Sequence, residues 1–206
     1  MNPDFAVALP VERDERRQWA FEVRHLERLL RGTSYPDQVK RIAELVGLLE
    51  AQGSTTLVVD QTGVGRPVVD MLRDARLSPI AVTITGGDTL SQEGREYRVP
   101  KRDLVSAVQV ALQAEQLKIA ASLPLAKTLA DELLAFKVSI SLSGHDAYGN
   151  DVGQWREAPH DDLVLAVALA CWWGKKNPPV TYSFSRVPSQ RVDADFATLR
   201  RRRGRW

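Results

Sequence analysis

The sequence predicts an α/β fold in which a mixed sheet is flanked by helices on its faces. Two β-rich segments near the N-terminus are followed by short apolar runs that alternate with stretches of helical period. A run without any charge, Leu163–Trp173, then predicts a helix that is buried on every side. In sheets of this kind, ligands bind beyond the carboxyl ends of the parallel strands.

The first part of the chain is expected to contain two strands, a helix, a further strand and a second helix. Segments Phe5–Glu12 and Trp19–Leu29 are typical of a strand pair joined by a charged linker. Apolar residues three or four positions apart predict a helix over 35–50. The run Thr55–Asp60 is short, apolar and rich in β-branched residues, which indicates a buried parallel strand. A helix over 61–75 is expected to follow.

The second part continues the alternation of strands and helices. The elements we expect are, in order, a buried strand Ser78–Thr85, a polar loop from Gly86 to about Arg98, a helix Lys101–Leu117 preceded by Pro100, a short strand at Lys118–Ala120, a helix over about 124–135, a β-hairpin over Phe136–Trp155, and the buried helix. The hairpin is predicted from the alternation of apolar residues and from turn residues within the segment, at Ser143–Gly144 and Gly149–Asn150.

Composition and charge are those of one globular domain with a tail. The chain has 206 residues, of which 44% are hydrophobic, so it can bury a sizeable core. We expect a domain over 1–175 and a linker with a basic tail over 176–206. The net charge of +2 argues neither for nor against nucleic acid, but Leu199–Trp206 contains five arginines. Such a tail can bind phosphate, although it is more often only solvated.

Cysteine usage and hydropathy favour a soluble, cytoplasmic protein. The single cysteine, Cys171, lies inside the apolar run and is expected to be a buried thiol. We find no signal peptide, and the apolar run is shorter than the roughly 18–20 residues that a membrane crossing needs.

Three carboxylates are the candidate chemical groups. Asp60 ends a predicted buried strand, and Asp161 and Asp162 begin the buried helix, which must pack on the same sheet. Because carboxylates in one place repel each other, a divalent cation would stabilise the arrangement, and oxygen ligands indicate Mg²⁺ or Mn²⁺. Such ions promote phosphodiester hydrolysis. Each acid also has a structural interpretation, since Asp caps helices and forms turns. His160 is either a cap neighbour or a group that orients a ligand.

Two glycines follow Asp60 in the stretch TGVGRP. Neither a third glycine at dinucleotide-fold spacing nor a Gly-Lys-Ser/Thr sequence is present, which excludes the Rossmann and P-loop patterns. Gly63 and Gly65 are instead expected to let the strand-to-helix turn pass close to a site at Asp60.

Five ordered segments carry a resemblance to a known family. They are VVDQTGVGRPVVDMLRDA, PIAVTITGGD, VPKRDLVSAVQVALQ, LAFKVSISLSGHDAYG and HDDLVLAVALA. In this order they resemble the C-terminal nuclease domain of the large terminase subunit of tailed bacteriophages and prophages, over about Asp4 to Trp173. The resemblance implies a ribonuclease-H-like fold and a metal-dependent endonuclease that cuts concatemeric viral DNA at the start and end of packaging, in the host cytoplasm.

The resemblance also implies roles for individual residues. Asp60 matches the acid after the family's second core strand, and Asp161 and Asp162 match the acids of its HDD motif. Lys101 and His160 match neighbouring positions of the site, and Asp4 matches an accessory acid. The implied partners are double-stranded DNA, the portal protein, the small terminase subunit and a separately encoded ATPase segment.

The sequence departs from the family in two respects. The upstream ATPase motor is absent, and the first catalytic Asp with its strand would fall before Met1. Because that strand is central in a ribonuclease-H-like sheet, we expect a gap between two strands that both lack a partner. The alternative function is therefore a catalytically inactive remnant that binds DNA or the portal. A junction resolvase or transposase-like nuclease would share the acids but not the order of the segments.

Overall fold

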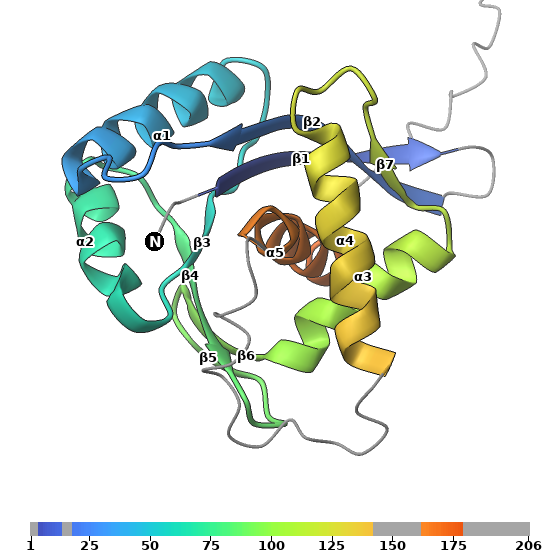
Figure 1. Ribbon diagram of the computed structural model, residues 1–206. Coiled ribbons are helices and arrows are strands. Elements are labelled where there is room, and N and C mark those ends of the chain that lie inside the picture. Colours follow the sequence, from blue (N-terminus) through green and yellow to red (C-terminus); the bar gives the residue numbers. More distant parts are fainter. Residues whose placement is uncertain (1–3, 14–17, 142–161, 179–206) are drawn as a thin grey trace, which may run out of the picture.

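The fold consists of two mixed β-sheets with helices packed around and between them (Figure 1). The structure, a computed structural model, describes residues 4–13, 18–141 and 162–178. The predicted α/β class with helices on mixed sheets is confirmed within these ranges. The strands form two separate sheets there, where the residue pattern predicted one mixed sheet and the resemblance predicted a gap within it.

The first sheet contains the N-terminal strand pair. Strands β1 (Asp4–Arg13) and β2 (Gln18–Arg28) are antiparallel, with an irregularity in the register between Val7 and Ala8. The short strand β7 (Leu117–Ile119) adds to β2 in parallel. The predicted strand pair and the predicted strand near Lys118 are thus confirmed, and β1 lies at one edge of this sheet.

The second sheet has the strand order β3-β4-β6-β5. Strands β3 (Val58–Asp60), β4 (Ile80–Thr85) and β6 (Glu96–Pro100) are parallel, and β5 (Ser91–Glu93) returns antiparallel to β6. Strand β3 is shorter than predicted and only half-buried, because it is an edge strand with a neighbour on one side.

The polar loop predicted from Gly86 to about Arg98 was wrong, since β5 and β6 form a hairpin there. The chain reverses at Gly94, whose φ of +57° lies in the left-handed region that glycine tolerates. Tyr97 and Val99 are 5% and 0% exposed and hold β6 in the core. The sequence signal was weak because the outward side chains of this hairpin are polar and β5 is exposed throughout.

The hairpin predicted over Phe136–Trp155 was also wrong in its first part. Helix α4 (Ala126–Ser141) continues through Phe136 to Ser141. The helix contains no Gly or Pro, and extending it by one residue costs less than starting a new element, so a short alternation of apolar residues does not end it. Residues 142–155 of the predicted hairpin lie outside the described residues.

The helix over 35–50 is confirmed to the residue. Helix α1 (Tyr35–Glu50) begins after Ser34, whose hydroxyl accepts a hydrogen bond from the Asp37 backbone N–H at 3.3 Å. This N-cap satisfies one of the free donors of the first turn, and Pro36 suits the start of a helix. The segment expected to be one helix over 61–75 contains a 3₁₀ turn, η1 (Gly63–Gly65), and α2 (Arg66–Asp74). Helix α3 (Lys101–Gln113) is slightly shorter than predicted.

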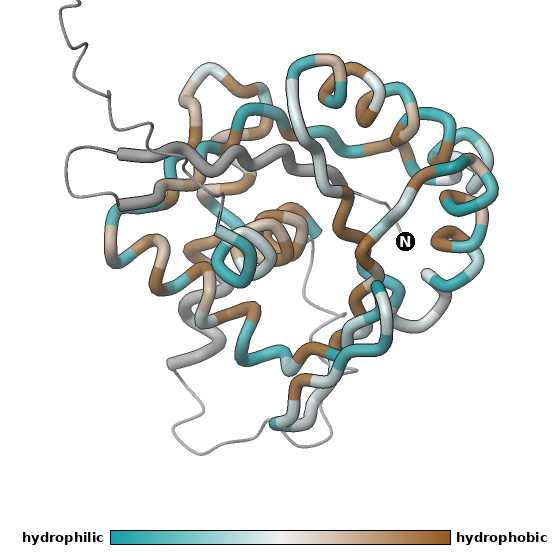
Figure 2. The backbone as a smooth tube through the Cα atoms, turned by 180° about the vertical axis from the view of Figure 1, so that it is seen from behind, coloured by the Kyte–Doolittle hydropathy of each residue, from teal (hydrophilic) through white to brown (hydrophobic). Residues whose placement is uncertain are grey.

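Helix α5 (Asp162–Lys176) lies in the middle of the molecule and contacts both sheets (Figures 1 and 2). It packs against β1, β2, β3, α3 and α4. The predicted buried helix is thereby confirmed. Burial raises the pKa of the Cys171 thiol to about 12, so this cysteine is an inert part of the core. The buried residues of α5 are Leu163, Val164, Val167, Ala168, Leu169, Cys171 and Trp172.

A second apolar cluster joins α1 and α2 to the outer face of β3. It contains Val39, Ile42 and Val46 of α1 and Leu72 of α2, with Val59 of β3 packed against it. Val58 packs instead against the main core that contains α5. Because side chains alternate along a strand, Asp60 lies on the α5 side of β3 and Gln61 on the α2 side.

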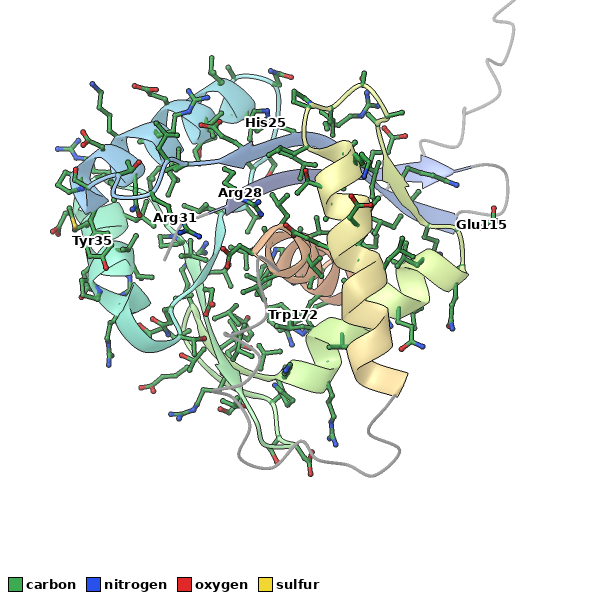
Figure 3. All side chains as sticks on the ribbon, viewed as in Figure 1. His25, Arg28, Arg31, Tyr35, Glu115 and Trp172 are labelled. Carbon is green, nitrogen blue, oxygen red and sulfur yellow. The ribbon has the colours of Figure 1, made fainter. Side chains whose placement is uncertain are left out.

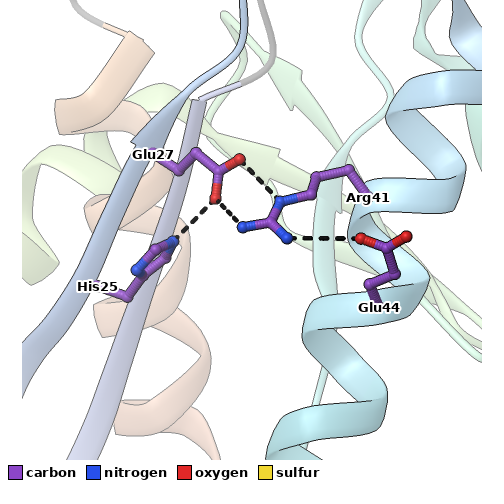
Figure 4. A network of polar contacts seen from close by, with 4 residues as sticks. All are labelled: His25, Glu27, Arg41 and Glu44. Atoms are coloured by element: carbon purple, nitrogen blue, oxygen red, sulfur yellow. Dashed lines mark hydrogen bonds and ion pairs between the residues drawn. The ribbon is translucent and has the colours of Figure 1, made fainter.

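A polar network connects α1 to β2 (Figure 4). The carboxylate of Glu27 accepts two hydrogen bonds of 2.9 Å from the guanidinium of Arg41. His25 contacts the same carboxylate at 3.0 Å, and Arg41 also lies 3.5 Å from Glu44. The bidentate contact with Arg41, followed by the contact with His25, lowers the pKa of Glu27 below its ordinary value of 4.5 despite the opposing effect of burial.

This network predicts a stability difference that depends on pH. A carboxylate with a lowered pKa in the folded state stabilises the protein above its ordinary pKa, and this contribution is lost as the pH falls through the folded value. Urea unfolding of Glu27→Gln should therefore give a free energy about 1 kcal/mol or less below that of the unmutated chain at about pH 7. The difference should shrink steadily as the pH falls below the ordinary value of 4.5. A difference that keeps the same size over this pH range would contradict this assignment.

Candidate functional site

The carboxylate of Asp60 is held at the carboxyl end of β3 by the residue two positions later. Its Oδ1 accepts a hydrogen bond from the Thr62 backbone N–H at 2.8 Å and another from the Thr62 hydroxyl. The same hydroxyl accepts a hydrogen bond of 2.8 Å from the backbone N–H of Ile84 in β4. Asp60 therefore forms the turn that its structural interpretation predicted. This turn also orients the carboxylate relative to two strands.

The glycines after Asp60 allow a close approach of the backbone. A Cβ atom on Gly65 would lie 2.7 Å from the carbonyl oxygen of Asp60, which is closer than real Cβ contacts. Gly63 has a φ of +72°, in the left-handed region. The predicted close approach of the turn to Asp60 is confirmed at Gly65.

Replacing Gly65 with alanine should displace the end of β3. The clash is with backbone and cannot be relieved by a side-chain rotation, so we expect a loss of about 1–3 kcal/mol in the free energy of unfolding, as for overpacked sites. Gly53→Ala is the matched control, since a Cβ there meets nothing within 4 Å. Urea unfolding of both variants tests this prediction. Equal stability of the two variants would contradict it.

Of the two acids predicted at the start of the buried helix, the structure describes one. Asp162 is the first residue of α5 and is half-buried. Helix α5 contacts β3, the strand that ends at Asp60, so the two carboxylates belong to elements packed on each other. Asp161 and His160 lie outside the described residues. Among the residues that the structure describes, no three His, Cys, Asp or Glu side chains are grouped as a metal site.

The structure also describes the positions of the two other predicted residues, Lys101 and Asp4. Lys101 is the first residue of α3 and directly follows β6. Because β3 and β6 both run parallel to β4, Asp60 and Lys101 lie at the carboxyl ends of parallel strands, at the same end of the second sheet. Asp4 begins β1 in the first sheet, opposite Arg28.

The first and second sheets are not joined within the described residues. β1 is the last strand of one sheet and β3 the last strand of the other, and both contact α5. A strand edge presents unpaired backbone N–H and C=O groups. The candidate site at Asp60 therefore lies beside an interruption between two sheets that share one buried helix.

Thr62 is a residue of this site that sequence reasoning missed. The signal was present, because an Asp followed two positions later by a residue with a free backbone N–H is the pattern of an Asx turn. Its hydroxyl contact with β4 has no local signal, since Ile84 is distant in the sequence.

Comparisons of the chain with protein-family models, curated proteins and solved structures found no match. In the ranges that the structure describes, none of the helices combines the length and apolar character needed to cross a lipid bilayer.

Proposed function

We propose that the chain is a divalent-metal-dependent DNA endonuclease domain with a ribonuclease-H-like fold, of the kind found in phage packaging terminases. The observation that carries the proposal is the placement of two predicted acids. Asp60 ends the edge strand β3, and Asp162 begins the buried helix α5, which packs on that strand.

The residues present fit a hard cation. Asp60 and Asp162 offer carboxylate oxygens, which are the ligands that Mg²⁺ and Mn²⁺ prefer. Both side chains are half-buried, so they are accessible to an ion while partly shielded from solvent. A bound ion would supply an activated water and would stabilise the charge that develops during phosphodiester hydrolysis. Thr62 keeps the Asp60 carboxylate in one orientation, and Asp161 is proposed as a further ligand.

The interruption between the sheets supports the ribonuclease-H-like interpretation. The resemblance predicted a missing central strand with an unpaired strand on either side. The edges of β1 and β3, both packed on α5, are where such a strand would fit. The first catalytic acid of the family would then be supplied by that strand, from another segment.

The same interruption favours a second candidate function. Without the additional strand and its acid, the chain would keep only part of the ligand set. A catalytically inactive module that binds DNA or the portal protein, with its arginine-rich C-terminal segment as a contact, is the alternative.

A nicking assay on supercoiled plasmid separates the two functions. The nuclease is expected to convert supercoiled to open circular DNA with Mn²⁺ or Mg²⁺ and to lose this activity in EDTA. Calorimetric titration with Mn²⁺ provides a second readout that does not require cleavage. Absence of both cleavage and Mn²⁺ binding, together with salt-sensitive retention of DNA, would overturn the nuclease proposal and support the binding module.

A further inference from the structure

A polar pocket opens beside the second sheet, and its lining comes from the turn after β3 and from β4, β5 and β6. It has a volume of about 570 Å³, which is within the range of roughly 300–1,000 Å³ that small ligands occupy. Gln61 and Arg66 line one side, Thr83 and Arg98 come from β4 and β6, and Gln92 comes from β5. The pocket is thus built by the turn after β3 together with the β5–β6 hairpin.

Two arginines that line this pocket differ from nearby arginines in their ion pairing. Arg73 binds Glu96 at 2.8 Å, Arg95 donates to backbone carbonyl oxygens, and Arg102 pairs with Asp88 at 2.6 Å. Arg66 and Arg98, by contrast, are exposed and form no ion pair with any residue that the structure describes. Two guanidinium groups at one pocket are therefore available to an anion.

Two acidic residues, Glu96 and the exposed Glu93, also line the pocket, and Glu96 is paired with Arg73. The hydrogen bond from Arg73 holds the pKa of Glu96 below the ordinary value. A second hydrogen bond comes from the amide of Gln61. Because Glu96 is paired in this way, its charge opposes an incoming anion less than that of a lone carboxylate would.

Gln61 adds an unused acceptor. Its amide nitrogen donates to the Thr83 hydroxyl at 3.1 Å, whereas its Oε1 is buried and has no hydrogen-bond partner among the described residues. A buried acceptor without a partner costs free energy, and a ligand that brings an N–H group would relieve that cost. The pocket therefore combines an anion site with an acceptor for a donor group.

We propose that this pocket binds one unpaired nucleotide of DNA, with its phosphate at Arg66 and Arg98 and an N–H group of its base at the Oε1 of Gln61. A nucleotide carries both features in one molecule of suitable size. Gln61 directly follows Asp60, and the two side chains lie on opposite faces of β3, so a strand that crosses this edge of the sheet would reach both. The choice of nucleic acid rests on the proposed function.

Fluorescence anisotropy of a labelled short single-stranded oligonucleotide, measured with the full chain in EDTA, tests this inference without any cleavage. The double variant Arg66→Gln/Arg98→Gln is expected to bind at least about tenfold more weakly, as for the loss of charge-assisted hydrogen bonds. Its log Kd should depend on log salt with a slope smaller by about 0.7 for each phosphate that the variant no longer neutralises. Arg76→Gln is the matched control, since Arg76 is exposed at the end of α2 and does not line the pocket.

An abasic oligonucleotide of the same length tests the contact with the base. The unmutated chain should prefer the oligonucleotide with bases, and Gln61→Leu should lose that preference while its thermal unfolding remains cooperative. A fully paired hairpin duplex should bind more weakly than the single strand, and a free mononucleotide should compete only weakly.

The inference is overturned if the double variant and Arg76→Gln weaken binding equally, if the abasic strand binds as well as the strand with bases, or if a free mononucleotide binds more tightly than the strand. Metal-dependent nicking that persists in such a case leaves the proposed function standing. If the chain does not nick DNA but its binding to the single strand still depends on Arg66 and Arg98, only the proposed function is overturned.

Discussion

Replacing Asp60 with asparagine is expected to reduce metal-dependent plasmid nicking by about 1000-fold, which corresponds to about 4 kcal/mol of transition-state stabilisation. Asparagine has nearly the same shape, and its Oδ1 can still accept the hydrogen bond from the Thr62 backbone N–H that forms the turn. The fold at the end of β3 should therefore persist, and the lost negative charge would account for the effect. The same substitution at Asp162 is expected to have an effect of similar size.

Initial nicking rates with Mn²⁺ and thermal unfolding of each variant are the measurements. Asp131→Asn is the matched control, because Asp131 is exposed on α4 and pairs only with Lys127 of its own helix among the described residues. It should retain the full rate. Unchanged nicking in both Asp60→Asn and Asp162→Asn would show that these carboxylates do not hold the ion.

Replacing Trp172 with alanine is expected to lower the free energy of unfolding by about 3–5 kcal/mol, as for other large aromatic residues in cores. Trp172 is 7% exposed and lies on the inside of the molecule (Figure 3). Its ring meets that of Tyr97 edge to face, with centroids 5.5 Å apart, and so joins α5 to β6. The substitution would leave a cavity where the central helix contacts the second sheet.

Urea unfolding followed by circular dichroism measures this decrease. Trp173→Ala is the comparison, because Trp173 also contacts Tyr97, at 5.7 Å, but is only half-buried. It should cost clearly less than Trp172→Ala. A cost of less than about 1 kcal/mol at Trp172 would contradict the position of α5 as the shared core of the two sheets.

The elements that were predictable have strong local signals. Helix α1 was predicted with correct ends because Ser34 caps it, Pro36 suits its first turn and its apolar residues follow the helical period. The buried helix α5 was predictable because a long apolar run without charges is most stable when it is buried in the core. The β5–β6 hairpin and the extension of α4 were missed, since packing of Tyr97 and continuation of an existing helix decided them.

At the candidate site too, local features were predictable and long-range contacts were not. The strand-terminal Asp60, the helix-initial Asp162 and the close approach at Gly65 are local features, and each was inferred from residue type and position. Thr62 and the pocket formed by Gln61, Arg66 and Arg98 were not inferred. The contact of Thr62 with Ile84 and the pocket contacts with β4 and β6 join segments that are far apart in the sequence, and no short pattern records such contacts.

The sequence by itself determined the order of most strands and helices, the burial of α5 and the carboxylates at the ends of two elements, because these depend on local period, propensity and turn chemistry. The resemblance predicted a gap in the sheet, but only the tertiary structure decided which strands border it: within the described ranges, β1 and β3 are the edge strands of two separate sheets. Strand pairing joins segments that are distant in the sequence, and its backbone hydrogen bonds can be formed by nearly every residue type. The side chains therefore carry little information about it until the packing around α5 selects the partners.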